Sequence, residues 1–157
     1  MDNINTTIST GEPVAEQASA VDTPGTTSTG LPAGYLADGF LEMASTGKPF
    51  LRAVYVGTFA QEVASLLQSM SPAVFYSGFL RDAKKHLRRG VPYEAQATCA
   101  AAMLPQAIKL TAKRKAPPVL VDIITAAVGA VQDTATFEAL YKHLDAVYAF
   151  MLQGGDT

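Results

Sequence analysis

The chain has 157 residues, of which 48% are hydrophobic, and this is enough for one domain with an ordinary packed core. Its formal net charge of −2 hides a strongly uneven distribution of charge along the sequence. A single cysteine, Cys99, excludes an internal disulfide and predicts a protein of the reducing cytoplasm.

No targeting or membrane segment is expected. The first thirty residues contain neither Lys nor Arg and no apolar run, which is unlike a secretory signal or a transit peptide. The longest largely apolar stretch, residues 119–131, is too short to cross a bilayer and contains Asp122.

Residues 1–30 are rich in Thr, Ser and Gly, and such a segment buries too little apolar surface to offset the entropy of ordering it. We therefore expect a flexible tail at 1–30 and a folded domain at 31–155. A short element at 35–44, interrupted by Gly39, has no clear type.

Prolines and capping residues then mark a series of helices. Thr46 to Pro49 opens a first helix that is predicted to run to Met70. Ser71 and Pro72 cap a second helix, which Gly90 stops.

The remaining helices follow from the same signals. A third helix begins near Pro92, and Pro105 is expected to kink it or split it in two. Apolar side chains at helical spacing predict a fourth helix that ends near Val131 and a last one from Asp133 or Thr134 to Gly154. The predicted fold class is all-α, a single bundle of about five to six helices.

Nine of the twelve Lys and Arg residues fall between positions 81 and 115. Only Asp82 and Glu94 oppose them, so this basic zone has a net charge of +7. Such a localised positive field is typical of a face that binds a polyanion. The nine candidate nucleic-acid contacts are Arg81, Lys84, Lys85, Arg88, Arg89, Lys109, Lys113, Arg114 and Lys115.

Spacing places the first part of this zone on one side of the second helix, because Arg81, Lys84, Lys85 and Arg88 follow an i, i+3, i+4, i+7 pattern. The second part is expected to follow across a turn, so that the two form neighbouring ridges. A solvated helix face usually mixes both signs of charge, whereas the five cations from Arg81 to Arg89 face one acid, Asp82. Phosphate contacts of this kind give affinity with little recognition of base sequence.

Catalytic, cofactor and metal sites are not expected. Asp82 and His86 are four residues apart, but without a nucleophile nearby they predict a local ion pair. His143 lies beside core positions of the last helix, and two His with one Cys do not make a metal site. Gly47 and Lys48 lack the other residues of a phosphate-binding loop.

Four stretches carry a likeness to a known family. They are Gly34-Tyr35-Leu36-Ala37-Asp38-Gly39-Phe40-Leu41, Met70-Ser71-Pro72 before a basic helix, Leu104-Pro105-Gln106-Ala107 leading to Lys113, and Phe137-Glu138-Ala139-Leu140 continuing to Leu144-Asp145-Ala146-Val147-Tyr148-Ala149-Phe150. In this order they resemble the small all-helical subunit of type III-A CRISPR (Csm) effector complexes, over roughly residues 31–155.

The resemblance implies a non-catalytic subunit without cofactors. Several copies would stack along the effector beside its other subunits and contact the phosphates of the duplex of guide RNA and target RNA. A-form duplexes are recognised mostly through shape and backbone, which agrees with a basic zone that lacks catalytic groups.

Three other functions compete with RNA binding. The main alternative is a helical adaptor whose basic face docks an acidic protein partner. A small enzyme is disfavoured because no nucleophile–base pair or metal set is present, and a helix-turn-helix DNA binder would need Asn, Gln or Ser beside Arg on its recognition helix.

Overall fold

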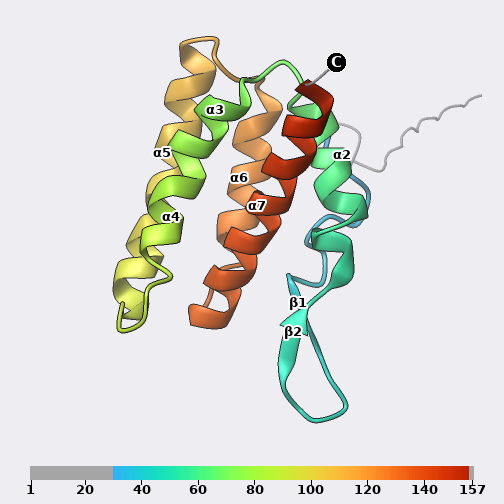
Figure 1. The fold of residues 1–157 in the computed structure, drawn as a ribbon, viewed down its shortest axis with the longest axis vertical. Coiled ribbons are helices and arrows are strands. Elements are labelled where there is room, and N and C mark those ends of the chain that lie inside the picture. Colours follow the sequence, from blue (N-terminus) through green and yellow to red (C-terminus); the bar gives the residue numbers. More distant parts are fainter. Residues whose placement is uncertain (1–29, 156–157) are drawn as a thin grey trace, which may run out of the picture. The chain divides into compact units, whose positions relative to one another are not determined.

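Helices make up most of the protein, as Figure 1 shows for a computed structural model that describes residues 30–155. Within that range the chain forms five helical segments, counting α3, η5 and α4 as one continuous run. They are α2 (Thr58–Leu66), the run of α3 (Pro72–Phe75), η5 (Tyr76–Leu80) and α4 (Arg81–Lys85), then α5 (Tyr93–Ala112), α6 (Val119–Gly129) and α7 (Thr134–Gly155). The predicted helical fold is confirmed, whereas the tail predicted at 1–30 lies, except for Gly30, outside the described residues.

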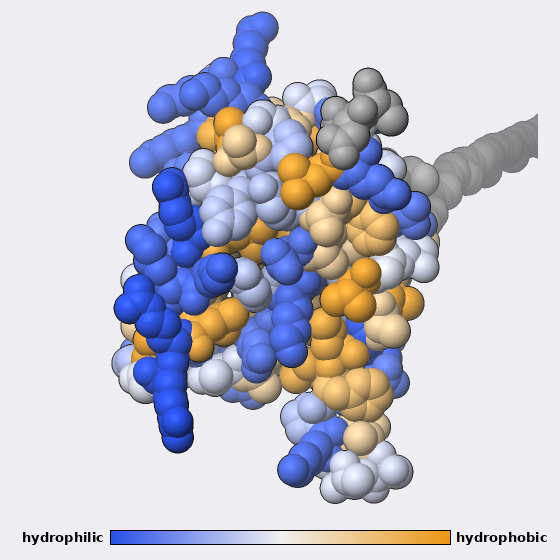
Figure 2. Space-filling model, in the orientation of Figure 1, coloured by the Kyte–Doolittle hydropathy of each residue, from blue (hydrophilic) through white to orange (hydrophobic). Residues whose placement is uncertain are grey.

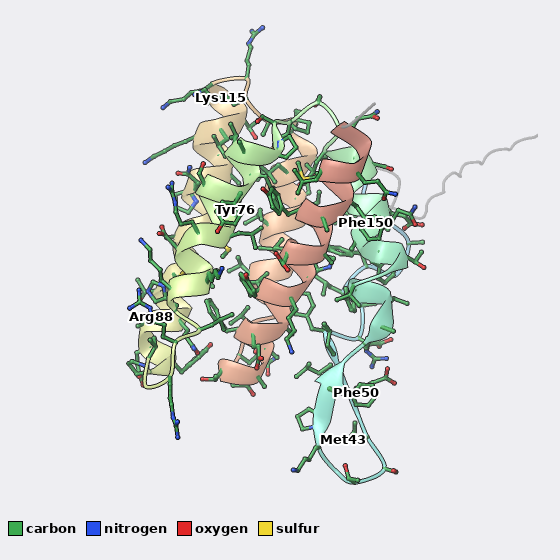
Figure 3. All side chains as sticks on the ribbon, viewed as in Figure 1. Met43, Phe50, Tyr76, Arg88, Lys115 and Phe150 are labelled. Carbon is green, nitrogen blue, oxygen red and sulfur yellow. The ribbon has the colours of Figure 1, made fainter. Side chains whose placement is uncertain are left out.

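A small antiparallel hairpin precedes the helices and was not predicted. Strand β1 (Leu41–Met43) pairs with β2 (Pro49–Leu51), and a single turn of 3₁₀ helix, η4 (Ala53–Tyr55), follows. Met43 and Phe50 lie on this hairpin (Figure 3) and are among the exposed large hydrophobic residues.

The predicted helix over 46–70 is therefore wrong in its first half. Gly47 has φ +86°, a left-handed conformation that ends helical propagation, and its N–H donates to the carbonyl of Ala44 at 2.9 Å. The N–H of Ala44 in turn donates to the carbonyl of Lys48, which closes the hairpin. Helix α2 starts only after Gly57.

Helix α7 is the centre of the packing. It contacts α2, α3, η5, α5 and η4, while α6 packs against α5. One side of α7 is completely buried. It consists of apolar residues at helical spacing, namely Phe137, Leu140, Leu144 and Val147. The predicted start of this helix is also confirmed, because the Asp133 carboxylate accepts a hydrogen bond from the N–H of Thr136 at 2.8 Å.

The helix that begins at Pro72 departs from α-helical geometry in its middle turn. Ser71 caps its start, but η5 is a π-helical turn, which inserts an extra residue into the repeat. As a result Phe75, Phe79 and Leu80 all face the core, and Ala83 continues the buried side into α4.

Helices α5 and α6 follow the sequence pattern closely. Pro105 does not split α5, which continues from Tyr93 to Ala112, and this proline lies on the exposed side of the helix. Residues 119–129 of the apolar stretch form α6, which ends two residues before Val131 and whose Leu120 and Ile123 are fully buried. None of the helices within residues 30–155 is long and apolar enough to span a membrane.

Candidate nucleic-acid interface

All nine cations of the basic zone are exposed on the folded protein. Figure 2 shows strongly hydrophilic side chains gathered on the side of the molecule formed by α4 and α5. Within the described part of the chain, Lys85 alone among the nine forms an ion pair, with Asp82 at 4.0 Å. A pair this long and this exposed contributes little, so the positive field of the zone is not neutralised by the protein itself.

The predicted stripe on the second helix is only partly helical. Arg81, Lys84 and Lys85 lie on α4, with buried Ala83 on the opposite side of the helix. Arg88 and Arg89 lie beyond the helix end, in the turn that leads to α5. The helix predicted to continue to Gly90 therefore ends five residues earlier, and we call these five cations the α4 cluster.

Competing hydrogen bonds end the helix at this point. The N–H of Leu87 donates to the carbonyl of Lys84, three residues back, so the last turn tightens. The side chain of Gln96 on α5 donates to the carbonyl of His86 at 2.9 Å, and this removes an acceptor that a longer helix would use. Gly90, at φ +90°, then reverses the chain.

The other four cations form a second group at the far end of α5, which we call the α5–α6 cluster. Lys109 lies in the last turn of α5, and Lys113, Arg114 and Lys115 form the turn that follows. The N–H of Lys115 donates to the carbonyl of Leu110 at 2.9 Å, and the N–H of Arg114 donates to Thr111 at 3.0 Å. These two bonds define a Schellman motif.

In that motif Arg114 has φ +60°, a conformation for which glycine is the usual residue. A side chain in the left-handed region costs about 1–2 kcal/mol relative to its normal conformation. A cation thus occupies a position where an uncharged glycine would have a lower conformational energy. Backbone strain of this kind occurs most often at functional sites.

We expect Arg114→Gly to raise the free energy of unfolding by about 1 kcal/mol, because it removes this strain. If Arg114 contacts phosphate, the same variant binds RNA more weakly, so stability and affinity change in opposite directions.

Lys113→Gly is the matched control. It removes a charge at a residue with φ −84°, so both quantities are expected to fall. Urea unfolding and RNA titration of the two variants measure both, and an unchanged stability for Arg114→Gly contradicts the assignment of strain.

The two clusters are not neighbouring ridges, which corrects the arrangement expected from the sequence. Arg88 and Lys115 lie at opposite ends of the α4 and α5 pair, as Figure 3 shows. The 20 residues of α5 separate the two turns, which corresponds to about 30 Å at about 1.5 Å per residue. Helix α5 runs back along the helix that carries the α4 cluster. The turn before α5 therefore belongs to the α4 cluster, and the turn after α5 belongs to the α5–α6 cluster.

Asp82 and His86 do not form the ion pair predicted for them. The Nδ1 atom of His86 lies 2.7 Å from the backbone carbonyl of Asp82, while the carboxylate of Asp82 approaches Lys85 instead. The imidazole of His86 therefore helps to close the helix end and is not aligned with an acid.

His143 is buried as expected, but it belongs to a polar network that the sequence did not reveal. Its Nδ1 donates to the backbone carbonyl of Tyr55 at 2.6 Å, so its Nε2 accepts from the hydroxyl of Tyr35 at 2.7 Å. Burial lowers the pKa of this imidazole to about 4. The hydroxyl of Tyr55 accepts a hydrogen bond from the N–H of Leu36. The network therefore connects the segment before β1 to α7.

The single cysteine, Cys99, is half-buried on α5. Burial, together with the charge of Asp82, raises the pKa of the Cys99 thiol to about 11, which disfavours a reactive thiolate. Between residues 30 and 155 no three His, Cys, Asp or Glu side chains form a group able to hold a metal ion.

Three comparisons with known proteins found no similar protein. No protein-family model matches the chain, and neither curated proteins nor solved structures include a match to it.

Proposed function

We propose that this chain is a non-catalytic subunit that binds the phosphate backbone of RNA. The observation that supports it is a set of nine exposed cations, eight of which have no ion-pair partner within residues 30–155. Exposed cations without acidic neighbours are typical of surfaces that bind a polyanion.

The sequence resemblance to the small subunit of type III-A CRISPR effectors suggests a specific setting for this activity. In that setting the protein works in the cytoplasm, in several copies, together with the other effector subunits. Its partners are the guide RNA and the target RNA, and cleavage of the target belongs to other subunits. The proposed contacts are to phosphates, which suits a duplex whose sequence is already set by base pairing.

The double substitution Lys84→Glu with Arg88→Glu tests the RNA contact. It reverses two charges of the α4 cluster, so at about 50 mM salt we expect RNA to bind at least about tenfold more weakly, because cation–phosphate contacts release counterions. For the wild type, the logarithm of the affinity is expected to fall linearly with the logarithm of the salt concentration. Both side chains are exposed, so the far-UV circular dichroism of the variant should match the wild type.

Lys142→Glu provides the matched control for this experiment. Lys142 is an exposed cation on α7, outside the basic zone, and it pairs with Glu138 at 3.4 Å. Reversing it should leave RNA affinity nearly unchanged at moderate salt. Equal RNA binding by the double variant and the wild type at low salt would refute the assignment.

A helical adaptor for an acidic protein is the alternative outcome. In that case the wild type binds a polyglutamate probe, and duplex RNA neither binds nor displaces it. If RNA is the ligand, a duplex displaces the probe, because both occupy the same cations.

A further inference from the structure

The α5 side of the surface between the two clusters is neutral. From Ala95 to Ile108, α5 carries no charged residue, and the exposed positions in its middle include Ala101 and Ala102. A polyanion that lies along this helix therefore meets no acidic side chain of α5 between the α4 cluster and Lys109.

This stretch is also hollowed. A groove of about 510 Å³ runs between α5 and the helical run that ends in α4. Asp82 and His86 line one wall, and Thr98, Ala102 and Gln106 line the other. Ala95 and Ala102 place no bulky side chain in the groove, while the side chains of Gln106 and Leu110 approach Gly78 closely.

Each end of the groove adjoins one of the clusters. Lys85 is three residues from Asp82 on α4, and Lys109 is three residues from Gln106 on α5. Residues three apart on a helix lie on nearly the same side, one turn along. The groove thus lies between the α4 cluster and Lys109 of the α5–α6 cluster, along residues 95–106 of α5.

We infer that both clusters contact the same RNA duplex, one at each end of the groove. This inference rests on the proposed function and adds a size requirement to it. The turn with Arg88 and Arg89 and the turn with Lys113, Arg114 and Lys115 are about 30 Å apart, and the other four cations lie between these turns. About 3.4 Å per nucleotide is the rise along a B-form strand, and an A-form RNA duplex rises less per base pair, so that distance corresponds to at least roughly nine base steps. A duplex shorter than about nine base pairs is too short to contact both of these turns at once.

Two contacts on one duplex make the second binding event intramolecular, which raises affinity without any new kind of contact. The wild type should therefore bind RNA duplexes weakly below about nine base pairs and at least about tenfold more tightly above that length. Beyond the step, affinity should rise only gradually, in proportion to the number of positions at which a longer duplex can be bound.

A series of RNA duplexes from about six to about twenty base pairs, titrated at constant salt, tests this inference. Two variants each disable one cluster: Lys84→Glu with Arg88→Glu at one end, and Lys113→Glu with Lys115→Glu at the other. Both variants should lose the increase in affinity near nine base pairs and retain only the gradual rise with length. Lys142→Glu should retain that increase.

The outcomes separate this inference from the function on which it rests. If the wild type binds duplexes but shows only the gradual rise that the variants show, the two clusters act independently and the inference fails. If the wild type binds no duplex of any length, the proposed function fails with it. If one variant keeps the step, the cluster that it disables takes no part.

Discussion

Replacing His143 with Leu is expected to lower the free energy of unfolding by about 2–5 kcal/mol. The imidazole is fully buried and has two buried partners, the carbonyl of Tyr55 and the hydroxyl of Tyr35. Leucine has a similar volume but offers no hydrogen bond, so both partners are left unpaired in the core. Each unpaired buried polar group costs about 1–3 kcal/mol.

Urea unfolding monitored by circular dichroism measures this effect, and two further variants control for it. Tyr35→Phe leaves one imidazole nitrogen unpaired and should cost about 1–2 kcal/mol, less than His143→Leu. His86→Leu makes the same substitution at the other histidine, whose ring bond to a backbone carbonyl is exposed to water, so a cost below about 1 kcal/mol is expected. Equal effects at the two histidines would contradict the role of the buried network.

The second large effect is a pH dependence of stability that originates at His143. Desolvation of the buried ring, set against the hydrogen bond to Tyr55, lowers the pKa of this imidazole from 6.5 to about 4. Between those two pH values the unfolded chain binds a proton that the folded protein does not. The stabilising contribution is therefore complete above about pH 6.5 and is lost as the pH falls toward 4.

The free energy of unfolding should consequently fall by about 2 kcal/mol between about pH 7.5 and pH 5, at up to about 1.4 kcal/mol per pH unit. The comparison uses urea unfolding at several pH values for the wild type and for His143→Leu. The variant should lack this part of the pH dependence, while His86→Leu should keep it. A pH dependence that is the same in the wild type and in His143→Leu would show that another group causes it.

The two C-terminal helices could be predicted well because their signals are local. Asp133 caps α7, Pro118 precedes α6, and apolar side chains recur at helical spacing in both. The sequence also indicated that the cations face water, since burying so many charges without partners is prohibitively costly.

The segment before α2 and the helix that begins at Pro72 were predicted less well, for different reasons. Gly47 permits both a loop and a helix start, and only the pairing of β1 with β2 selects the hairpin. The π-helical turn at Tyr76–Leu80 leaves no periodic signal of its own, because one extra residue changes which side chains face the core.

The sequence alone determined which charges the protein carries, that they cluster in one zone of the chain, and that a helical scaffold presents them to water. These properties depend on composition and on spacing within single helices. The tertiary structure decided that the zone divides into two clusters, whose outer turns lie about 30 Å apart because α5 folds back along its neighbour. It also brought His143 against Tyr35, 108 residues away in the chain, a contact that only the packing of distant segments creates.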